Sequence, residues 1–365
     1  MKRTAFVEEM EEQPQAILKT WEYFASDGGS ELVKIKDYIQ NYGIHRFLFT
    51  GLGSSYFASI VAYYMLSAAG IDCELREAGE FLLFQMPDSV PMGTAIILVS
   101  QSGESGEILE ILKHLNKINW PKTHIWAITN NPDSTLAKSS GCKLVSQAGP
   151  EKAVTSKSYV SSIIVAWLLA TAIIQEPNFS DRMREMIKKN VNYISEFMKE
   201  GEQTAKRILE FLGPEDKLHI IARGTSLATA YQAALNFKEM PKIYCEAISG
   251  SMFRHGPIEL VEKTFRCIII ENNPAATEFN LDLAKKIATV WGGGKCVVIS
   301  NQKTTWETLI QELQGLNKID LEKEKREEIA ASGNLASENI AAEIAKEESA
   351  SDKMENTQHE NQKND

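Results

Sequence analysis

The sequence predicts an α/β protein of two tandem, doubly wound lobes, each with a parallel sheet flanked by helices. Hydrophobic residues make up 43% of the 365 residues, enough for a sizeable core. Short apolar strands alternate with helical stretches, as in parallel α/β folds. The order strand, glycine turn, helix also occurs at two places in the chain. Gly53-Ser54-Ser55 in the first copy corresponds to Gly224-Thr225-Ser226 in the second, 171 residues further along. Such a long offset indicates two similar lobes, because the units of solenoid repeats are far shorter.

Each lobe is expected to begin with the same kind of unit. In chain order, the predicted elements are a strand over 46–50, a turn over 51–55, a helix over 56–69, a strand over 95–99, a loop over 100–105, a helix over 108–115, a helix over 159–174, a strand over 219–222, a turn over 223–226 and a helix over 228–240. A strand that leads through a glycine-rich turn into a helix is the anion-binding geometry of doubly wound sheets. Neither copy has the Gly-x-Gly-x-x-Gly pattern of dinucleotide-binding folds.

The loop Ser100-Gln101-Ser102-Gly103-Glu104-Ser105 has the features of a phosphate cradle. It joins a buried strand to a helix whose first N–H groups are free to bind an anion, and Gly103 lets the backbone approach the ligand closely. The loop lacks the Gly-x-x-x-x-Gly-Lys-Ser/Thr pattern of nucleotide P-loops, so a sugar-phosphate monoester fits better than a triphosphate. Taken alone, the loop could equally be an ordinary serine-rich turn.

Four segments in order resemble the sugar isomerase (SIS) domain family, within it the isomerase domain of glucosamine-6-phosphate synthases and the SIS-type sugar-phosphate deglycases and deaminases. They are 11–14, 53–55, 100–105, and 238–239 followed by 253–257. The resemblance covers roughly residues 6–300 and implies two SIS lobes. It also implies a set of residues that hold the sugar phosphate: Ser55, Ser100, Gln101, Ser102 and Ser105.

The resemblance further implies that Glu239 is the base for enolisation and that His255 is the acid/base that opens the sugar ring. The residue types suit that chemistry, because a carboxylate can move a proton between adjacent sugar carbons and histidine transfers protons near neutral pH. We expect Glu239, at the end of an apolar helix, to be partly shielded from water, and His255 to lie in a turn bounded by glycine and proline. Without the resemblance, a solvated acid and a surface histidine would be the simpler interpretation.

A third segment, 151–157, precedes the apolar helix over 159–174. The resemblance implies that Glu151, Thr155 and Lys157, together with Ser54, contact the substrate. Thr155 or Ser156 could instead cap the helix, and both roles are compatible, because a helix start is also an anion site. The apolar run is shorter than the roughly 20 residues that span a bilayer, so we assign it to the core.

The chain also departs from the synthases. Residues 1–3 run directly into the SIS body without a glutaminase, Asn236 stands where the synthases have lysine, and no motif matches their C-terminal lysine loop. We therefore expect an enzyme that releases an amine from an amino-sugar phosphate or a glycated amine 6-phosphate, a deglycase or deaminase acting as a hydrolase. The alternatives are an aldose-ketose isomerase and a non-catalytic sugar-phosphate sensor.

Composition sets the remaining expectations. The net charge of −10 argues against nucleic acid as a partner, and no leader precedes the first helix, so we expect a cytoplasmic protein that does not bind membranes. The five cysteines lack C-x-x-C spacing, and we expect buried thiols, no metal and no cofactor. The resemblance implies a homodimer or larger homo-oligomer. We expect a helical segment over 1–40, lobes over 41–200 and 201–317, and a charged, disordered tail over 318–365.

Overall fold

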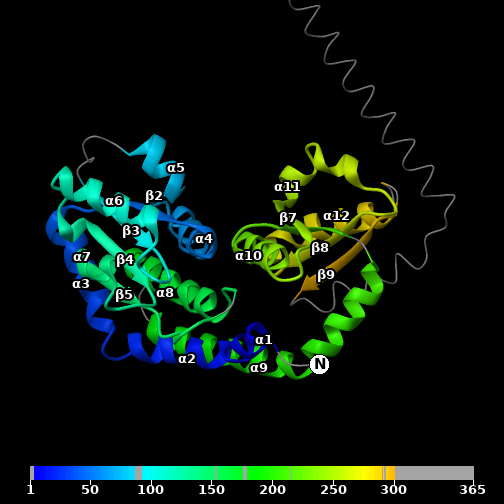
Figure 1. Ribbon diagram of the computed structural model, residues 1–365, viewed down its shortest axis with the longest axis horizontal. Helices are drawn as coiled ribbons and strands as arrows, with labels where there is room; N and C mark the ends of the chain where they lie inside the picture. The colour runs from blue at the N-terminus through cyan, green and yellow to red at the C-terminus, as the bar shows by residue number, and fades with distance from the viewer. Residues whose placement is uncertain are drawn as a thin grey trace, which may run out of the picture.

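The computed structural model describes residues 4–86, 93–152, 154–175, 179–214, 216–289, 291 and 293–300. Two lobes stand side by side above a long helix (Figure 1). The predicted tail over 318–365 lies outside the described residues.

The first lobe contains a five-stranded parallel sheet in the order β2-β1-β3-β4-β5. Its strands are β1 (Arg46–Gly51), β2 (Asp72–Glu77), β3 (Thr94–Val99), β4 (Ile125–Thr129) and β5 (Cys142–Val145). The second lobe contains a four-stranded parallel sheet in the order β7-β6-β8-β9. Its strands are β6 (Lys217–Ala222), β7 (Tyr244–Ser249), β8 (Arg266–Glu271) and β9 (Lys295–Ser300). The predicted fold class is confirmed.

Helices cover both faces of each sheet. The N-terminal helices are α1 (Ala5–Glu11), α2 (Gln13–Phe24) and α3 (Gly29–Tyr42). The first lobe adds α4 (Gly53–Ala68), α5 (Ala78–Glu80), the π-helix η1 (Phe81–Gln85), α6 (Gly106–Lys117), the 3₁₀ helix η2 (Lys122–His124), α7 (Thr135–Ser139) and α8 (Lys157–Ile174). The second lobe adds α10 (Ser226–Glu239), α11 (Gly250–Phe253), the 3₁₀ helices η3 (Pro257–Leu260) and η4 (Pro274–Ala276), and α12 (Thr277–Thr289).

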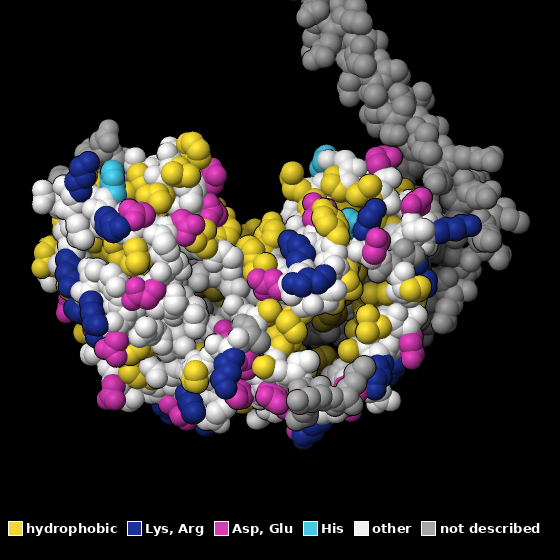
Figure 2. All heavy atoms as spheres, viewed as in Figure 1, with side chains coloured by type: hydrophobic (Ala, Val, Ile, Leu, Met, Phe, Trp, Pro, Cys, Tyr) yellow, Lys and Arg dark blue, Asp and Glu magenta, His cyan; other side chains and the backbone are white. Residues whose placement is uncertain are grey.

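A single helix, α9 (Phe179–Leu212), joins the two lobes and runs through the boundary predicted at residue 200. The lobes also meet where α4 packs against α10, between the two sheets (Figure 1). There the rings of Phe57 and Tyr231 stack with their centroids 5.4 Å apart. The molecule is hollowed between the lobes on the side away from α9 (Figure 2).

The cores explain why the strands read as continuous apolar runs. All six residues of β3 are buried, because helices cover both faces of the sheet. Phe49 and Trp126 are fully buried on one face of the first sheet, and a separate cluster fills the other face. The expectation that the apolar run of α8 is too short to span a bilayer is wrong, because this helix has 18 residues and is long and apolar enough to do so by length and composition. Since 72% of it is buried inside the protein, the assignment to the core holds.

The cysteines are free thiols. Three of them, Cys142, Cys245 and Cys267, are buried, as expected, whereas Cys73 and Cys296 are only half-buried. Burial raises the pKa of the Cys245 thiol to about 12, so it remains protonated at neutral pH.

The strand order fixes where a ligand can bind. In both sheets the chain starts in the middle, at β1 or β6, adds one strand on one side and then the rest on the other. The loops that follow β1 and β3 therefore diverge and leave a crevice at the carboxyl ends of these strands. The turn over 51–55 and the loop over 100–105 lie at this crevice.

Candidate active site

A pocket of about 280 Å³ opens where the crevice of the first lobe faces α10 of the second. Residues 52–55, Gln101, Ser102, Ser105, Thr155, Ser158, Tyr159, Ser162, Leu235 and Glu239 line it. These residues come from the turn after β1, the loop after β3, the start of α8 and the end of α10. The structure thus brings together most of the side chains that the sequence singled out.

The phosphate loop, residues 100–105, is held in shape by its own hydrogen bonds. The hydroxyls of Ser100 and Ser105 lie 2.9 Å apart, and the Gly103 N–H donates to Ser100 Oγ at 3.1 Å. Gly103 has a φ of 67°, and a Cβ there would lie 2.2 Å from Ser134 Oγ, so the position requires glycine. Ser100 is buried and is not among the pocket-lining residues, which indicates that it braces Ser105 from behind.

The starts of α4, α6 and α8 all lie at the pocket. Ser54 and Ser55 lie in the first turn of α4, and Ser105 is the N-cap of α6. Neither helix start has a side-chain cap among the described residues. Their first N–H groups, together with the helix dipoles, therefore favour an anion at this point, and no basic side chain is needed.

Glu239 is the last residue of α10 and lines the pocket from the second lobe. The prediction that it is shielded from water is wrong for the single chain, because Glu239 is exposed. The reason is that α10 ends at Glu239, and its neighbours Lys238 and Met240 are exposed as well. A carboxylate is thus placed at the rim, on the opposite side from the phosphate loop.

His255 lies elsewhere. It is exposed in the turn between α11 and η3, next to Gly256 with its φ of 123°, and it is not among the residues that line the pocket. The turn is found where the sequence placed it. The single chain nevertheless does not bring His255 and Glu239 into one pocket.

The segment 151–158 enters the pocket through Thr155 and Ser158. Glu151 caps α8: its carboxylate accepts from the N–H groups of Ser156 at 2.8 Å and Ser158 at 3.2 Å, and from the Ser158 hydroxyl. Ser156 is the N-cap residue of α8, as the sequence allowed, but its side chain makes no capping hydrogen bond. The Glu151 carboxylate, five residues before Ser156, accepts from the free N–H groups instead.

Lys157 turns away from the pocket. Its ammonium is buried and pairs with Glu12, while Glu9 accepts a hydrogen bond from the Lys152 N–H at 2.6 Å. Both acids lie in the N-terminal helical segment. Lys157 and Glu151 thus hold the segment in place, and neither lines the pocket in the single chain.

Replacing Glu151 with Ala is expected to lower the free energy of unfolding by about 1–2 kcal/mol, because two N–H groups in the first turn of α8 lose their acceptor. Urea titration measures the loss. Glu151→Gln is the matched control, since it keeps an acceptor oxygen and should lose less. Equal stability of Glu151→Ala and the parent would contradict the capping role.

Sequence reasoning placed Leu52 and Gly53 in the turn after the first strand without naming them as site residues, and it missed Ser158, Tyr159, Ser162 and Leu235 altogether. A weak signal for the serines was available, because Ser158, Ser161 and Ser162 all lie in the first half of a helix that is apolar over most of its length, but nothing in the sequence showed which of the three face a pocket. Nothing in the sequence pointed to Tyr159 or Leu235, which have the pattern of core residues.

Burial raises the pKa of the Tyr159 phenol, so this side chain lines the pocket as a neutral group.

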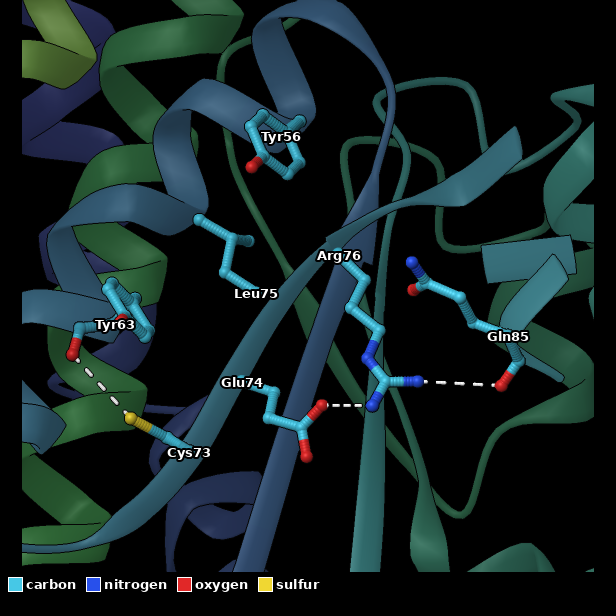
Figure 3. A pocket seen from close by; sticks show the side chains of 7 residues that line it. All are labelled: Tyr56, Tyr63, Cys73, Glu74, Leu75, Arg76 and Gln85. Carbon is cyan, nitrogen blue, oxygen red and sulfur yellow. Dashed lines mark hydrogen bonds and ion pairs between the residues drawn. The ribbon is translucent and has the colours of Figure 1, made fainter. Parts of the chain in front are cut away.

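A larger cavity of about 740 Å³ lies along the edge strand β2 (Figure 3). Its charged groups already have partners: Arg76 pairs with Glu74 and donates to the Gln85 carbonyl at 3.4 Å, and Glu74 also pairs with Arg46. The cavity contains none of the residues expected to be catalytic. Among the described residues, no group of three or more His, Cys, Asp or Glu side chains could hold a metal ion.

Comparison with known proteins gives a consistent picture. The family model described as "SIS domain" matches residues 42–172 and 211–307. The chain is 27% identical over 267 residues to a glutamine–fructose-6-phosphate aminotransferase (isomerizing) of Sulfurisphaera tokodaii, covering 73% of this chain and 43% of that protein. It is 28% identical over 321 residues to one of Bradyrhizobium diazoefficiens, covering 85% and 51%. The chain thus matches about half the length of these relatives.

Solved structures share the fold. The C-terminal domain of glucosamine-fructose-6-phosphate aminotransferase from Francisella tularensis has a TM-score of 0.73 at 21% identity, over 84% of this chain and 86% of that one. Glucosamine-6-phosphate deaminase from Thermotoga maritima gives 0.58 at 23% identity, over 79% and 85%. Tagatose-6-phosphate ketose/aldose isomerase from Escherichia coli gives 0.61 at 16% identity, over 85% and 89%. The predicted two-lobed architecture is confirmed by these likenesses.

Proposed function

Because the chain belongs to the SIS domain family, we propose that it is a sugar-phosphate enzyme that releases an amine from an amino-sugar phosphate or from a glycated amine 6-phosphate. One observation carries the proposal: the serine-rich phosphate loop of the first lobe and Glu239 of the second line the same pocket. An anion site and a carboxylate on opposite sides of one small pocket suit a phosphorylated substrate that undergoes proton transfer.

The phosphate would lie between the phosphate loop and the first turn of α4. Hydroxyls of Ser55, Ser102 and Ser105 donate hydrogen bonds to it, and the helix starts add N–H groups. With the phosphate fixed, the carbon chain of the sugar extends across the pocket towards Glu239. Binding of the phosphate thus positions the reacting carbons near the base.

In the proposed reaction of a 1-amino-ketose phosphate, Glu239 takes a proton from C1, next to the C2 carbonyl. The electrons of the C–H bond form a C1–C2 double bond and those of the carbonyl bond move to its oxygen, which takes up a proton from water, giving an enaminol. Glu239 then returns a proton to C2 while the nitrogen gives up its N–H proton to water, which leaves an imine at C1 and a hydroxyl at C2. Water then adds to C1 and the C–N bond breaks, which yields the amine and an aldose 6-phosphate. Because water attacks the imine directly, this route needs no covalent adduct with the protein.

The proposal is tested by incubating the protein with amino-sugar 6-phosphates and with fructose- and glucose-derived amino-acid adducts bearing a 6-phosphate. Released amine and released hexose phosphate are assayed separately. Equal amounts of both support amine release. Interconversion of unsubstituted aldose and ketose phosphates without amine release would make the protein an isomerase, and binding without turnover would make it a sensor.

We further propose that the active unit is a homo-oligomer in which His255 serves the pocket of a neighbouring copy. His255 is exposed and is not among the pocket-lining residues of its own chain, yet ring opening needs a proton shuttle near the sugar.

A complementation experiment tests the shared site. His255→Ala and Ser102→Asp variants, each inactive alone, should partly recover activity when co-expressed, because a mixed dimer contains one pocket with both functional groups. About a quarter of parent activity is the upper limit expected from random pairing of equal amounts, since half of the dimers are mixed and each has one intact site. No recovery, or an active species that sediments as a monomer, would contradict the proposal.

A further inference from the structure

The second lobe reaches the substrate-facing segment of the first lobe through one buried side chain, Gln232 of α10. Its Nε2 donates to the carbonyl of Thr155 at 3.3 Å and to Asn236 Oδ1 at 2.7 Å. Gln232 is 4% exposed, and both bonds are part-buried, because Thr155 and Asn236 are half-buried. Thr155 lines the pocket directly, and Asn236 lies three residues before Glu239 on the same helix.

The orientation of the Gln232 amide is fixed by its partners. A backbone carbonyl can only accept a hydrogen bond, so the amide nitrogen must face Thr155. The amide oxygen of Gln232 is buried and has no hydrogen-bond partner among the described residues. Burying an unpaired carbonyl destabilises a fold, whereas an apolar side chain of similar length would avoid that penalty. Packing alone therefore does not account for glutamine at this position.

Gln232 also lies where it can fix the position of Glu239 relative to the first lobe. It lies seven residues before Glu239, two helical turns away on the same face of α10, and Leu235 and Glu239 line the pocket from that helix. The neighbouring contact between the lobes is the stack of Phe57 on Tyr231, which is apolar and tolerates sliding. The bond from Gln232 to Thr155 is directional and resists such sliding.

We propose that Gln232 is a positioning residue, which fixes the pocket-lining segment 151–158 relative to Glu239 across the boundary between the lobes. Its catalytic consequence rests on the proposed function. A proton-transferring carboxylate must reach the reacting carbon closely, and a displacement of about 1 Å can slow such a step by about 10²-fold. The hydrogen bond is thus expected to act on turnover and not on the binding of the phosphate.

The first test is Gln232→Met, which preserves length and apolar packing but removes the amide. We expect kcat to fall by about 10-fold or more while KM changes by less than about 3-fold, because the phosphate loop is untouched. The melting temperature should change little, since removal of the unpaired carbonyl offsets the loss of the donor to the half-buried Thr155 carbonyl and Asn236 Oδ1. Gln40→Met, on the exposed side of α3, is the matched control and should behave like the parent.

The second test does not depend on turnover. Hydrogen–deuterium exchange of peptides covering 151–158 should be faster in Gln232→Met than in the parent, because the segment loses its anchor on α10. Asn236→Ala keeps the bond to Thr155 and should leave exchange of this segment close to that of the parent.

Several outcomes would overturn the proposal. Unchanged kcat or unchanged exchange in Gln232→Met would do so, as would a fall in kcat that accompanies a lower melting temperature. Faster exchange in Asn236→Ala, as large as in Gln232→Met, would also do so. If the parent turns over none of the substrates, the proposed function fails, and the exchange comparison still decides whether Gln232 anchors the segment.

Discussion

Glu239→Gln is expected to lower kcat by about 10² to 10⁴, the usual share of general acid–base catalysis. The amide has the shape of the carboxylic acid and can still form hydrogen bonds, but it cannot accept the proton that leaves the sugar carbon. Since Glu239 does not belong to the phosphate loop, KM should change little and the loss should appear in kcat. Steady-state kinetics with the best substrate of the panel measures both constants.

The matched control is Glu196→Gln, an equally conservative change at an exposed position of α9. It should keep full turnover and the melting temperature of the parent. Near-normal kcat in Glu239→Gln would show that Glu239 is not the base of the proposed mechanism, and it would favour the alternative function of a non-catalytic sugar-phosphate sensor. Loss of kcat together with loss of the fold would point to a structural role instead.

Ser102→Asp is expected to raise KM by more than about 10²-fold. The new carboxylate would stand next to a phosphate that is itself negative, and a unit charge at about 4 Å contributes roughly 4 kcal/mol of repulsion at an effective dielectric constant of 20. The fold should tolerate the change, because Ser102 is exposed and its hydroxyl only accepts from the Glu104 N–H at 3.2 Å, a bond that an aspartate oxygen can replace.

Ser102→Asn separates charge from shape. Asparagine has the size of aspartate and can accept from the same N–H group, so the difference in KM between the two variants reports the charge alone. Isothermal titration with inorganic phosphate gives a second measurement that needs no catalysis. An unchanged KM in Ser102→Asp, or equal effects of the two substitutions, would place the phosphate elsewhere.

The fold could be predicted because its signals are local. A buried parallel strand such as β3 is a continuous apolar run, and the glycine turns that follow β1 and β6 mark the point where strand gives way to helix. Helix ends were less predictable. The start of α8 is capped by Glu151, which accepts from a free N–H group of the helix start. Whether Glu151 can contact that N–H group depends on the conformation of the loop between them, and the residue type at the N-cap position does not reveal it.

The site was predictable only in part, for a related reason. The phosphate loop is a continuous segment, so its residues could be named together. The partner of Lys157 could not, because Glu12 lies 145 residues earlier and meets it only after the N-terminal helices dock on the first lobe. The exposure of Glu239 was also hidden, since the apolar residues of α10 face the sheet and the helix ends at the solvent.

The pocket takes its anion site from one lobe and its carboxylate from the other, and this division links the stabilities of the lobes. A ligand that contacts both halves binds only when both are folded, so its binding free energy is lost if either lobe unfolds. Without ligand, the two unfolding equilibria are coupled, within the part of the chain that the structure describes, through α9 and through contacts such as those of α10 with α4 and Thr155. Saturation with substrate adds RT ln(1 + [L]/Kd) to that coupling and draws two partly independent folding units towards one cooperative transition.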